Sequence, residues 1–508
     1  MPAYLPKRCW YAAKQLALKS ARIAQATLLP HAQSRPHLMP PMLAELEIET
    51  ERGRDLYLLP MGYIREEDIV TALPQQLALA RVRRGRTVGF LTDAYALDSF
   101  TYVILYLLRA QANLPSQDGE VRFIPTEELA KLEMGNEPAI RRMSAEQSNS
   151  SLIIEDMAVL KVIRHIAPGI HPEAEMGRYL TQIGYANSPA MLGEVTRFAA
   201  DGTPHTLMIM QRFLHNQGDA WEYTLDTLER AIHHAMVGES TSSEALAADL
   251  VKPEEELMRL ATTLGKRLGE LHHALATPTD QPDFAPHIAT EEDVLSWQQG
   301  ARDQLEAAFE VLRTHSDWND PADAECAHRL LEQREALLQK VEELARAGIG
   351  TKRIRIHGDF HLGQVLVSQG DVFIVDFEGE PARTLEQRRE KNSPMRDVAG
   401  LLRSFDYAAA VARNSGLGDL SEEDVVRKRE ILDAFVPQSQ QTFLAAYREA
   451  AYGENIPMKA EADDALRRMF VLEKSAYEIC YEAANRPTWL SVPLHGMGQM
   501  ADRLLRRP

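Results

Sequence analysis

Four residues in the C-terminal half have the types and the spacing to transfer a phosphoryl group. His357, Asp359 and Gln364 follow one apolar stretch, and Asp376 follows the next. Asp359 and Gln364 are five residues apart, and Asp376 comes twelve residues later, which is the spacing of phosphoryl-transfer catalytic loops with Gln in place of Asn. The reaction needs a carboxylate beside the attacking hydroxyl and hard oxygen ligands for Mg²⁺. We predict Asp359 as the catalytic base and Gln364 and Asp376 as the metal ligands.

Two other interpretations of this segment compete with phosphoryl transfer. One is a polar loop that joins two strands by chance, which the combined pattern makes a poor explanation. The other is a zinc pair, because His357 and His361 are four residues apart, as zinc ligands on a helix are. Gly358 and Gly363 disfavour a helix there, so we expect His357 to brace the loop by hydrogen bonds instead.

A second set of residues has the chemistry to hold a nucleotide. Lys161 lies inside the apolar run 157–163, where an unpaired ammonium is costly to bury, and Glu175 on the following helix is its expected partner. The alternative is a strand-edge lysine that reaches water. Residues 147–151, with Ser148 and Ser150, form a polar turn one hairpin earlier, which we expect to cover the phosphates of ATP. Gln211 belongs to the stretch 210–214, expected beside adenine.

The elements that must position these residues can be predicted from periodicity. Alternation over 46–58, interrupted at residues 52–54, predicts a hairpin, and leucines at steps of three and four over 257–275 predict an amphipathic helix. Further helices are expected over 99–111, capped by Asp98, from Pro172 onward, and over 324–347. Further strands are expected over 121–124, 157–163, 207–210, 353–356 and 372–375. Residues 237–252 read as a surface connection.

Composition narrows the class of protein. The chain has 508 residues, 45% of them hydrophobic, and a net charge of −18, which argues against nucleic-acid and anionic-membrane partners. Three widely spaced cysteines fit neither a disulfide framework nor a zinc site and suit a reducing cytoplasm. We find no apolar run long enough to span a membrane and no signal peptide, so we expect a cytoplasmic protein.

Several segments together resemble the bacterial maltokinases, which are relatives of the aminoglycoside phosphotransferases. The likeness covers nearly the whole chain and includes LPKRCWYAAK, EQSNSS, HGDFHLGQVL, IVDFEGEPAR, SPMRDVAGLLRSFDYAAA and YEAANRPTWLSVPLHGM. It implies transfer of the γ-phosphoryl group of Mg-ATP to the anomeric hydroxyl of maltose, giving maltose 1-phosphate for glycogen or α-glucan synthesis. Many members are fused to trehalose synthase, so this chain is expected to be free-standing or one part of such a fusion.

The resemblance also implies an architecture. The expected fold class is α+β, a bilobal protein-kinase-like fold with an N-terminal cap over 1–110, a small nucleotide-binding lobe over 111–212 and a large helical lobe over 213–508. Lys161, Ser148, Asp359, Gln364 and Asp376 keep the roles given above, and Asp397 is expected to be a buried structural aspartate. The cap motif departs from its relatives at Cys9 and Ala13.

The acceptor sugar is the least determined part of the sequence prediction. Late in the chain, one helix and the turn that ends it carry Tyr477, Tyr481, Glu482, Arg486 and Trp489, and Tyr477 and Tyr481 share a face. We assign Tyr481, Arg486, Trp489 and also His361 to the sugar site. The alternative is that Tyr477 and Trp489 are core residues. Two other functions stay open: an amino-sugar or aminoglycoside kinase, and a silent regulatory module, against which the intact Lys161, Asp359 and Asp376 argue.

Overall fold

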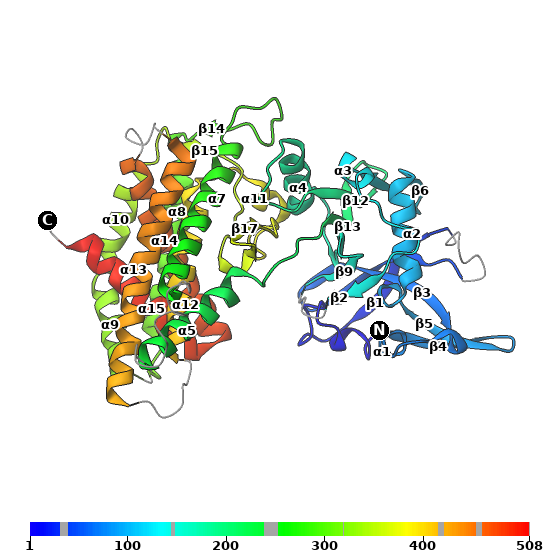
Figure 1. Ribbon diagram of the computed structural model, residues 1–508, viewed down its shortest axis with the longest axis horizontal. Coiled ribbons are helices and arrows are strands. Elements are labelled where there is room, and N and C mark those ends of the chain that lie inside the picture. The colour runs from blue at the N-terminus through cyan, green and yellow to red at the C-terminus, as the bar shows by residue number, and fades with distance from the viewer. Residues whose placement is uncertain are drawn as a thin grey trace, which may run out of the picture. The chain divides into compact units, whose positions relative to one another are not determined.

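The computed structural model describes residues 1–30, 39–143, 148–237, 252–318, 320–414, 421–453 and 460–506. The chain divides into two compact units: residues 1–215 with 383–387, and residues 216–382 with 388–508. The first unit mixes strands and helices, and the second is mainly helical (Figure 1). The predicted α+β class is therefore confirmed.

One sheet of the first unit is built from the N-terminal residues. Its strands pair antiparallel in the order β1-β2-β3-β5-β4, and β11 (His165–Ile166) pairs with β3. The bounds are β1 (Ser20–Leu28), β2 (Met42–Thr50), β3 (Gly53–Arg65), β4 (Ala78–Arg84) and β5 (Thr87–Asp93). The predicted hairpin is confirmed as β2–β3, and its turn requires Gly53, whose φ of +129° is rare for other residues.

The second sheet of this unit has seven strands in the order β6-β7-β12-β13-β10-β9-β8. They are β6 (Asn113–Pro115), β7 (Glu120–Pro125), β8 (Ile140–Arg142), β9 (Ser150–Ile154), β10 (Ala158–Val162), β12 (Met191–Phe198) and β13 (Pro204–Arg212). The strands predicted at 121–124, 157–163 and 207–210 are confirmed as β7, β10 and β13. In this order β9 and β13 flank the lysine-bearing β10 on its two sides, and both pair with it antiparallel.

Helices of the first unit are α1 (Leu73–Gln76), α2 (Asp98–Arg109), α3 (Glu127–Ala130) and α4 (Pro172–Gln182), with one-turn 3₁₀ segments η1 (Leu5–Lys7), η2 (Glu66–Asp68) and η3 (Ala94–Ala96). Pro172 opens α4 as predicted. The predicted cap of α2 is wrong: Leu97 is the N-cap, and Asp98 instead pairs with Arg142 at 2.6 Å. An ion pair to a neighbouring strand has replaced the local cap.

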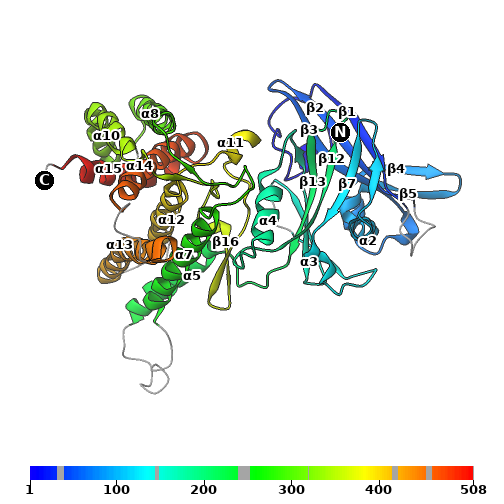
Figure 2. The same ribbon diagram turned by 90° about the horizontal axis from the view of Figure 1, so that it is seen from above.

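The two sheets of the first unit share one hydrophobic core. α2 lies along β7 and β12 (Figure 2) and buries Phe100 and Ile104. Leu43 and Leu58 of the N-terminal sheet belong to the same buried cluster, which also contains Leu160 of β10. Burial of apolar area stabilises a fold by about 25 cal/mol per Å². Residues on both sides of the predicted boundary at 110 therefore depend on each other for their stability.

The second unit is built from long helices: α5 (Ala220–Val237), α7 (Pro253–Leu275), α8 (Glu291–Thr314), α9 (Pro321–Glu332), α10 (Arg334–Arg346), α12 (Met395–Asn414), α13 (Glu422–Tyr452), α14 (Ala460–Asn485) and α15 (Ser491–Leu505). α7 packs along α13, and α14 contacts both α8 and α12 (Figure 1). The predicted leucine face is confirmed, since all six leucines from Leu257 to Leu275 are buried on α7. Shorter elements are η5 (Leu362–Gln364), η7 (Pro487–Trp489), β14 (His287–Ile288), β15 (Lys352–Arg353), β16 (Val365–Ser368) and β17 (Asp371–Ile374), whereas α11 (Leu385–Arg389) is divided between the two units.

Two predicted elements of the second unit differ from the structure. The helix expected over 324–347 is two helices, α9 and α10, with Gln333 between them as the C-cap of α9 and the N-cap of α10. The strand expected over 353–356 shrinks to β15 and an isolated bridge between Ile354 and Asn392. The connection expected over 237–252 lies outside the described residues except at its two ends. Of the helices in the described ranges, none has the length and apolar content to cross a bilayer.

Candidate active site

The loop that carries Asp359 is fixed by a buried carboxylate. Asp397, in the first turn of α12 and 1% exposed, accepts hydrogen bonds from the backbone N–H groups of His357 (2.8 Å) and Gly358 (2.9 Å). His272 Nε2 lies 3.1 Å from the same carboxylate. Burial alone would raise the pKa of Asp397, but His272 and the loop donors hold it below its ordinary value. Asp397 is therefore the buried structural aspartate that we predicted.

His357 joins the catalytic loop to the segment after β17. Its Nε2 donates to the carbonyl of Val375 at 2.9 Å, and its Nδ1 lies 3.4 Å from the backbone nitrogen of Asp359. The ring packs against Phe377, with ring centroids 5.0 Å apart. The bracing role predicted for His357 is confirmed. Residues 357–361 are not helical, so the zinc interpretation lacks the helix that it requires.

The predicted metal ligands emerge from one end of the β16–β17 hairpin. Val365 pairs with Ile374, and the backbone N–H of Val375 donates to the carbonyl of Gln364 at 3.0 Å. Gln364 therefore precedes β16 at the same end at which Asp376 follows β17. Asp376 has φ +65°, a conformation that is uncommon outside glycine and often found at functional sites. An amide and a carboxylate at one end of a hairpin are hard oxygen donors of the kind that Mg²⁺ takes.

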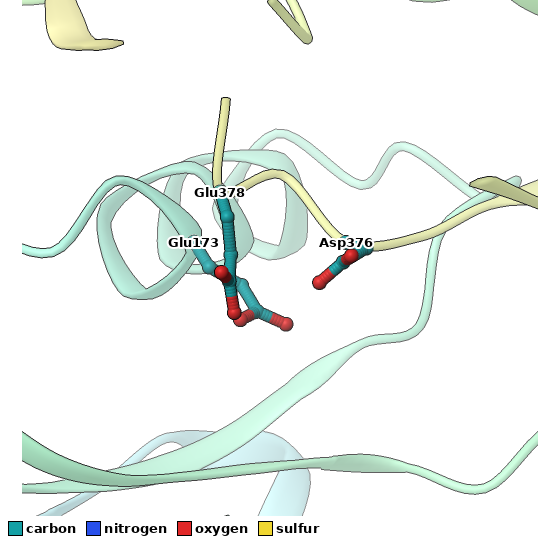
Figure 3. A group of neighbouring side chains, drawn as sticks. All are labelled: Glu173, Asp376 and Glu378. Carbon is teal, nitrogen blue, oxygen red and sulfur yellow. The ribbon is translucent and has the colours of Figure 1, made fainter. Parts of the chain in front are cut away.

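The segment after β17 carries a further carboxylate that we did not predict. The backbone N–H of Glu378 donates to the carbonyl of Asp376 at 2.8 Å, which closes a tight turn. Both side chains leave this segment in Figure 3. The sequence signal was the DFE triplet itself, in which the third residue stands two positions after the assigned metal ligand.

His361 lies beside Gln364. Its Nδ1 accepts from the backbone N–H of Gly363 at 3.1 Å, and its Nε2 lies 3.4 Å from the Gln364 side-chain nitrogen. Burial lowers the pKa of His361, against the opposing effect of Asp359, so the ring is neutral near pH 7. These contacts orient the predicted metal ligand, and the sugar contact assigned to His361 stays a prediction.

Lys474 of α14 is the neighbour of Asp359 that sequence reasoning missed. Its ammonium lies 3.5 Å from Asp359 Oδ1 and 5.0 Å from the centroid of the Tyr477 ring. Burial alone would lower the pKa of Lys474, but Asp359 and Glu478 raise it, so the side chain stays a cation. The available signal was its position one helical turn before Tyr477, on the helix already assigned to the sugar.

The aromatic face predicted on α14 is present. The rings of Tyr477 and Tyr481 stack with centroids 6.2 Å apart, and Tyr481 is 45% exposed. Tyr477 and Trp489 are only partly buried, which disfavours the interpretation that they are core residues. Arg486 lies over both Tyr481 and Trp489, at 5.7 and 5.5 Å from their ring centroids.

Glu482 anchors this end of α14. It is 1% exposed and accepts from Arg486 Nη2 at 2.6 Å and from the Tyr407 hydroxyl at 3.2 Å. A buried carboxylate with charged and neutral donors holds its partners in fixed positions. Arg486, which directly follows α14, is therefore held beside the aromatic face by a residue of that helix.

In the first unit, Lys161 forms an ion pair with Glu173, which we did not predict, and its pairing with Glu175 stays a prediction. Its ammonium lies 2.8 Å from Glu173 Oε2, and the two side chains are 15% and 2% exposed. Glu173 projects from the start of α4, as Figure 3 shows. The ion pair also replaces the alternative in which Lys161 reaches water.

The predicted phosphate-covering turn joins β8 to β9. Residues 144–147 of it lie outside the described residues, so Gln147 is not placed. Ser148 and Asn149 form a bend, and Ser150 begins β9. The Ser150 hydroxyl accepts from Arg164 Nε at 2.9 Å. Gln211 lies near the end of β13, opposite Val159 of β10 and Met191 of β12.

Comparisons with known proteins agree with this chemistry. The phosphotransferase enzyme family matches residues 139–406, a span that contains Lys161, Asp359, Gln364 and Asp376. The chain is 29% identical to a glucosamine kinase from Mycolicibacterium smegmatis over 364 residues, which is 71% of this chain and 79% of that protein. It is 26% identical to a glucosamine kinase from Streptacidiphilus jiangxiensis over 360 residues, 70% of this chain and 71% of that protein.

A solved structure covers almost the whole chain. A glucosamine kinase in complex with glucosamine, ADP and inorganic phosphate matches with a TM-score of 0.63 over 98% of each chain, at 19% sequence identity. A further crystal form of a glucosamine kinase matches with a TM-score of 0.61 over 96% of this chain and 91% of that chain, again at 19% identity. These likenesses show a common fold and confirm the predicted kinase-like class.

Proposed function

Because the chain belongs to the phosphotransferase enzyme family, we propose that it is an ATP-dependent sugar kinase that uses Mg²⁺. One observation carries this proposal: Asp359 stands on a loop fixed by Asp397 and tied through His357 to the hairpin end that bears Gln364 and Asp376. Such a loop holds a carboxylate, an amide and a second carboxylate in place before substrate binds. Preorganisation of this kind is the main protein contribution to phosphoryl transfer.

The proposed step is a direct transfer. The sugar hydroxyl gives its proton to Asp359, its oxygen forms a bond to the γ-phosphorus of ATP, and the bond from that phosphorus to the β–γ bridging oxygen breaks, which releases ADP. Lys161, held by Glu173, is assigned to the phosphates together with the Ser148–Ser150 turn and the backbone near Gln211. Bound to Gln364 and Asp376, Mg²⁺ would neutralise phosphate charge.

For the acceptor we propose maltose. The α14 face from Lys474 to Tyr481 begins beside Asp359 and extends for seven residues, about 10 Å at 1.5 Å per residue. That length suits two linked sugar rings, with one reacting hydroxyl at Asp359 and the second ring over the tyrosines. The predicted resemblance to maltokinases points the same way and adds trehalose synthase as a fused or associated partner, in a reducing cytoplasm where three free cysteines are stable.

Glucosamine is the second candidate acceptor. The named relatives, at 29% and 26% identity, are glucosamine kinases. The net charge of −18 suits a cationic acceptor as well. An amino sugar has one ring, so it would not need the outer part of the α14 face.

Release of ADP from Mg-ATP with maltose, glucosamine, glucose or an aminoglycoside as acceptor tests the proposal. With maltose we expect one reducing end to disappear for each ADP formed, because phosphorylation blocks the anomeric hydroxyl. If glucosamine is phosphorylated and maltose is not, glucosamine replaces maltose as the proposed acceptor. Nucleotide binding with no ADP release on any sugar would favour the silent module.

Tyr481→Ala sharpens the choice of acceptor. It should raise KM for maltose about tenfold, since an aromatic contact is worth about 1 kcal/mol or more, and leave KM for a one-ring sugar unchanged. Tyr106→Ala, which removes a 43% exposed tyrosine of α2, is the matched control. Equal KM values for maltose in both variants would contradict the assignment of Tyr481.

A further inference from the structure

Two residues of α12 hold α14 through buried carboxylates. Arg403 is 2% exposed, and its Nε donates to Glu478 Oε2 at 2.9 Å. One helical turn later, the Tyr407 hydroxyl donates to Glu482 Oε1 at 3.2 Å. Both partners on each helix are four residues apart, so the two contacts lie along one face of α12 and one face of α14. Breaking a buried ion pair leaves an uncompensated charge, so these contacts resist rotation of α14 against α12.

The guanidinium of Arg403 is also fixed by its other neighbours. Its Nη1 donates to Asp406 Oδ2 at 2.6 Å, and the side chain of Gln440 in α13 donates to the other oxygen of that carboxylate at 3.3 Å. Gly496 of α15 packs so closely that a Cβ there would lie 2.3 Å from Arg403 Nη1. Glycine is less favourable than alanine inside a helix, and at position 496 the missing side chain leaves space for the guanidinium.

The two α12–α14 contacts lie at the residues that carry the proposed acceptor face. Lys474, which lies 3.5 Å from Asp359 Oδ1, stands one helical turn before Glu478. Tyr481, whose ring belongs to the aromatic face, directly precedes Glu482. A side chain in a helix moves with its backbone. A shift at either contact therefore moves the acceptor face relative to the assigned base.

The same helix α12 fixes the catalytic loop through another face. Asp397 accepts from the loop backbone, and Ser404 Oγ accepts from the backbone N–H of Leu362 at 3.1 Å. Gly400 lies against the carbonyl of Phe360, where a Cβ would come within 2.4 Å of the oxygen. Residues 397, 400 and 404 follow at steps of three and four, so they share a face of α12. One helix therefore contacts both the loop that bears the base and the helix that bears the acceptor face.

We propose that Arg403 and Tyr407 are positioning residues for the acceptor sugar, through which α12 sets the place of the α14 face relative to Asp359. This inference rests on the proposed function, which assigns that face to the acceptor. Phosphoryl transfer needs the attacking oxygen in line with the leaving oxygen, and a misplacement of about 1 Å can cost roughly hundredfold in rate. The segment SPMRDVAGLLRSFDYAAA thereby acquires a second role, beyond that of Asp397.

The first test is Tyr407→Phe, which removes one hydroxyl and keeps the ring and every charge. Its matched control is Tyr223→Phe, because the hydroxyl of Tyr223 in α5 also donates to a glutamate of a neighbouring helix, Glu256 of α7. The control pair involves neither α12 nor α14. The measurements for each variant are kcat and KM for maltose and for glucosamine, KM for ATP, Kd for Mg-ADP by titration calorimetry, and Tm.

The second test is Gly496→Ala, which crowds the guanidinium of Arg403 without removing any group. Gly498→Ala, two residues along α15, is its matched control. A Cβ at position 498 would lie 2.7 Å from Cys326 Sγ of α9, so the control crowds a buried side chain that does not contact α12 or α14 in the described contacts. The same kinetic and binding constants are measured for both variants.

We expect Gly496→Ala to lower kcat/KM for the sugar that the wild-type protein phosphorylates, maltose or glucosamine, by roughly ten- to hundredfold. Tyr407→Phe should lower it about fivefold, from the loss of one hydrogen bond. KM for ATP and Kd for Mg-ADP should stay unchanged in both variants, because the nucleotide does not use the acceptor face. Tyr223→Phe and Gly498→Ala should lower Tm without changing kcat/KM.

A double variant decides whether the added methyl group acts through Arg403. Arg403→Lys removes the Nη1 that the methyl group would meet, so adding Gly496→Ala to Arg403→Lys should cause little further loss of kcat/KM. Losses that simply multiply would contradict the role of the guanidinium. If Arg403→Lys does not fold, Tyr407→Phe and Gly496→Ala alone still decide the proposal against their controls.

Two results would overturn the inference, and they differ in meaning. If the wild-type protein phosphorylates a sugar and Tyr407→Phe and Gly496→Ala match their controls, or raise KM for ATP as much as KM for the sugar, the positioning role is wrong and the kinase assignment stands. If the wild-type protein phosphorylates no sugar, the proposed function fails and this inference fails with it.

Discussion

The catalytic loop of the second unit and the phosphate-covering hairpin of the first are both held in place by buried side chains, but by partners at different distances in sequence. Asp397 accepts a hydrogen bond from His357 of the loop, 40 residues earlier in the sequence, and His357 lies within hydrogen-bond distance of the backbone of Asp359, two residues later. The hairpin depends on Asp93 and Tyr95, the latter 56 residues before Ser151. The loop is therefore a compact module that one motif describes, whereas the hairpin needs another sheet to define it.

The largest expected effect tests the loop side of this comparison. Asp359→Asn should lower kcat by about 10²–10⁴-fold, because general-base catalysis contributes about that much. Kd for Mg-ADP and Tm should change little, since Asp397 and His357 hold the loop through backbone groups of residues 357–359. Steady-state kinetics with calorimetric binding checks this. Full turnover in the variant would show that Asp359 is not the base.

The catalytic loop could be predicted from the sequence because its functional residues lie close together along the chain. HxDxxxxQ followed by a strand and DF locates Asp359, Gln364 and Asp376 without knowledge of the fold, and leucine periodicity located α7. The residues that were missed or misplaced depend on tertiary contacts. Lys474 meets Asp359 across 115 residues, and the Lys161–Glu173 ion pair depends on the rotation of α4 about its axis. Periodicity does not fix such a rotation to within one residue.

An intermediate effect tests the first unit. Glu173→Gln should raise KM for ATP about tenfold, because a neutral amide holds the Lys161 ammonium less firmly than a carboxylate does. Glu175→Gln, two residues along the same helix, is the control and should change KM by less than about threefold. Measuring KM for ATP and Tm for both variants decides which glutamate is the main partner of Lys161. A larger effect from Glu175→Gln would make Glu175, as first predicted, the main partner of Lys161.

The smallest effect is a pH dependence of stability that comes from the loop. Burial lowers the pKa of His361, so the unfolded chain takes up a proton more readily than the folded protein does. The free energy of unfolding should therefore fall as pH drops below the ordinary imidazole pKa of about 6.5. Above that pH, His361 should make no pH-dependent contribution to the free energy of unfolding. Urea unfolding at pH 7.5 and 5.5 measures the drop.

His361→Gln is the variant that isolates this contribution. It should reduce the drop between the two pH values without abolishing it, because burial also lowers the pKa of His205. An identical drop in wild type and variant would contradict the prediction. His205→Gln should reduce the drop independently, since His205 lies on β13, in the other unit.

A hydrophobic core that the two sheets of the first unit share limits how this protein can be shortened. Cutting the chain near residue 110 would uncover the apolar faces of α2 and β7 and leave β11 without β3 as its partner. Exposed apolar surface and unpaired strand edges promote aggregation. A fragment that begins at residue 139, where the family match starts, lacks α2, β3 and β7 and would therefore be expected to precipitate.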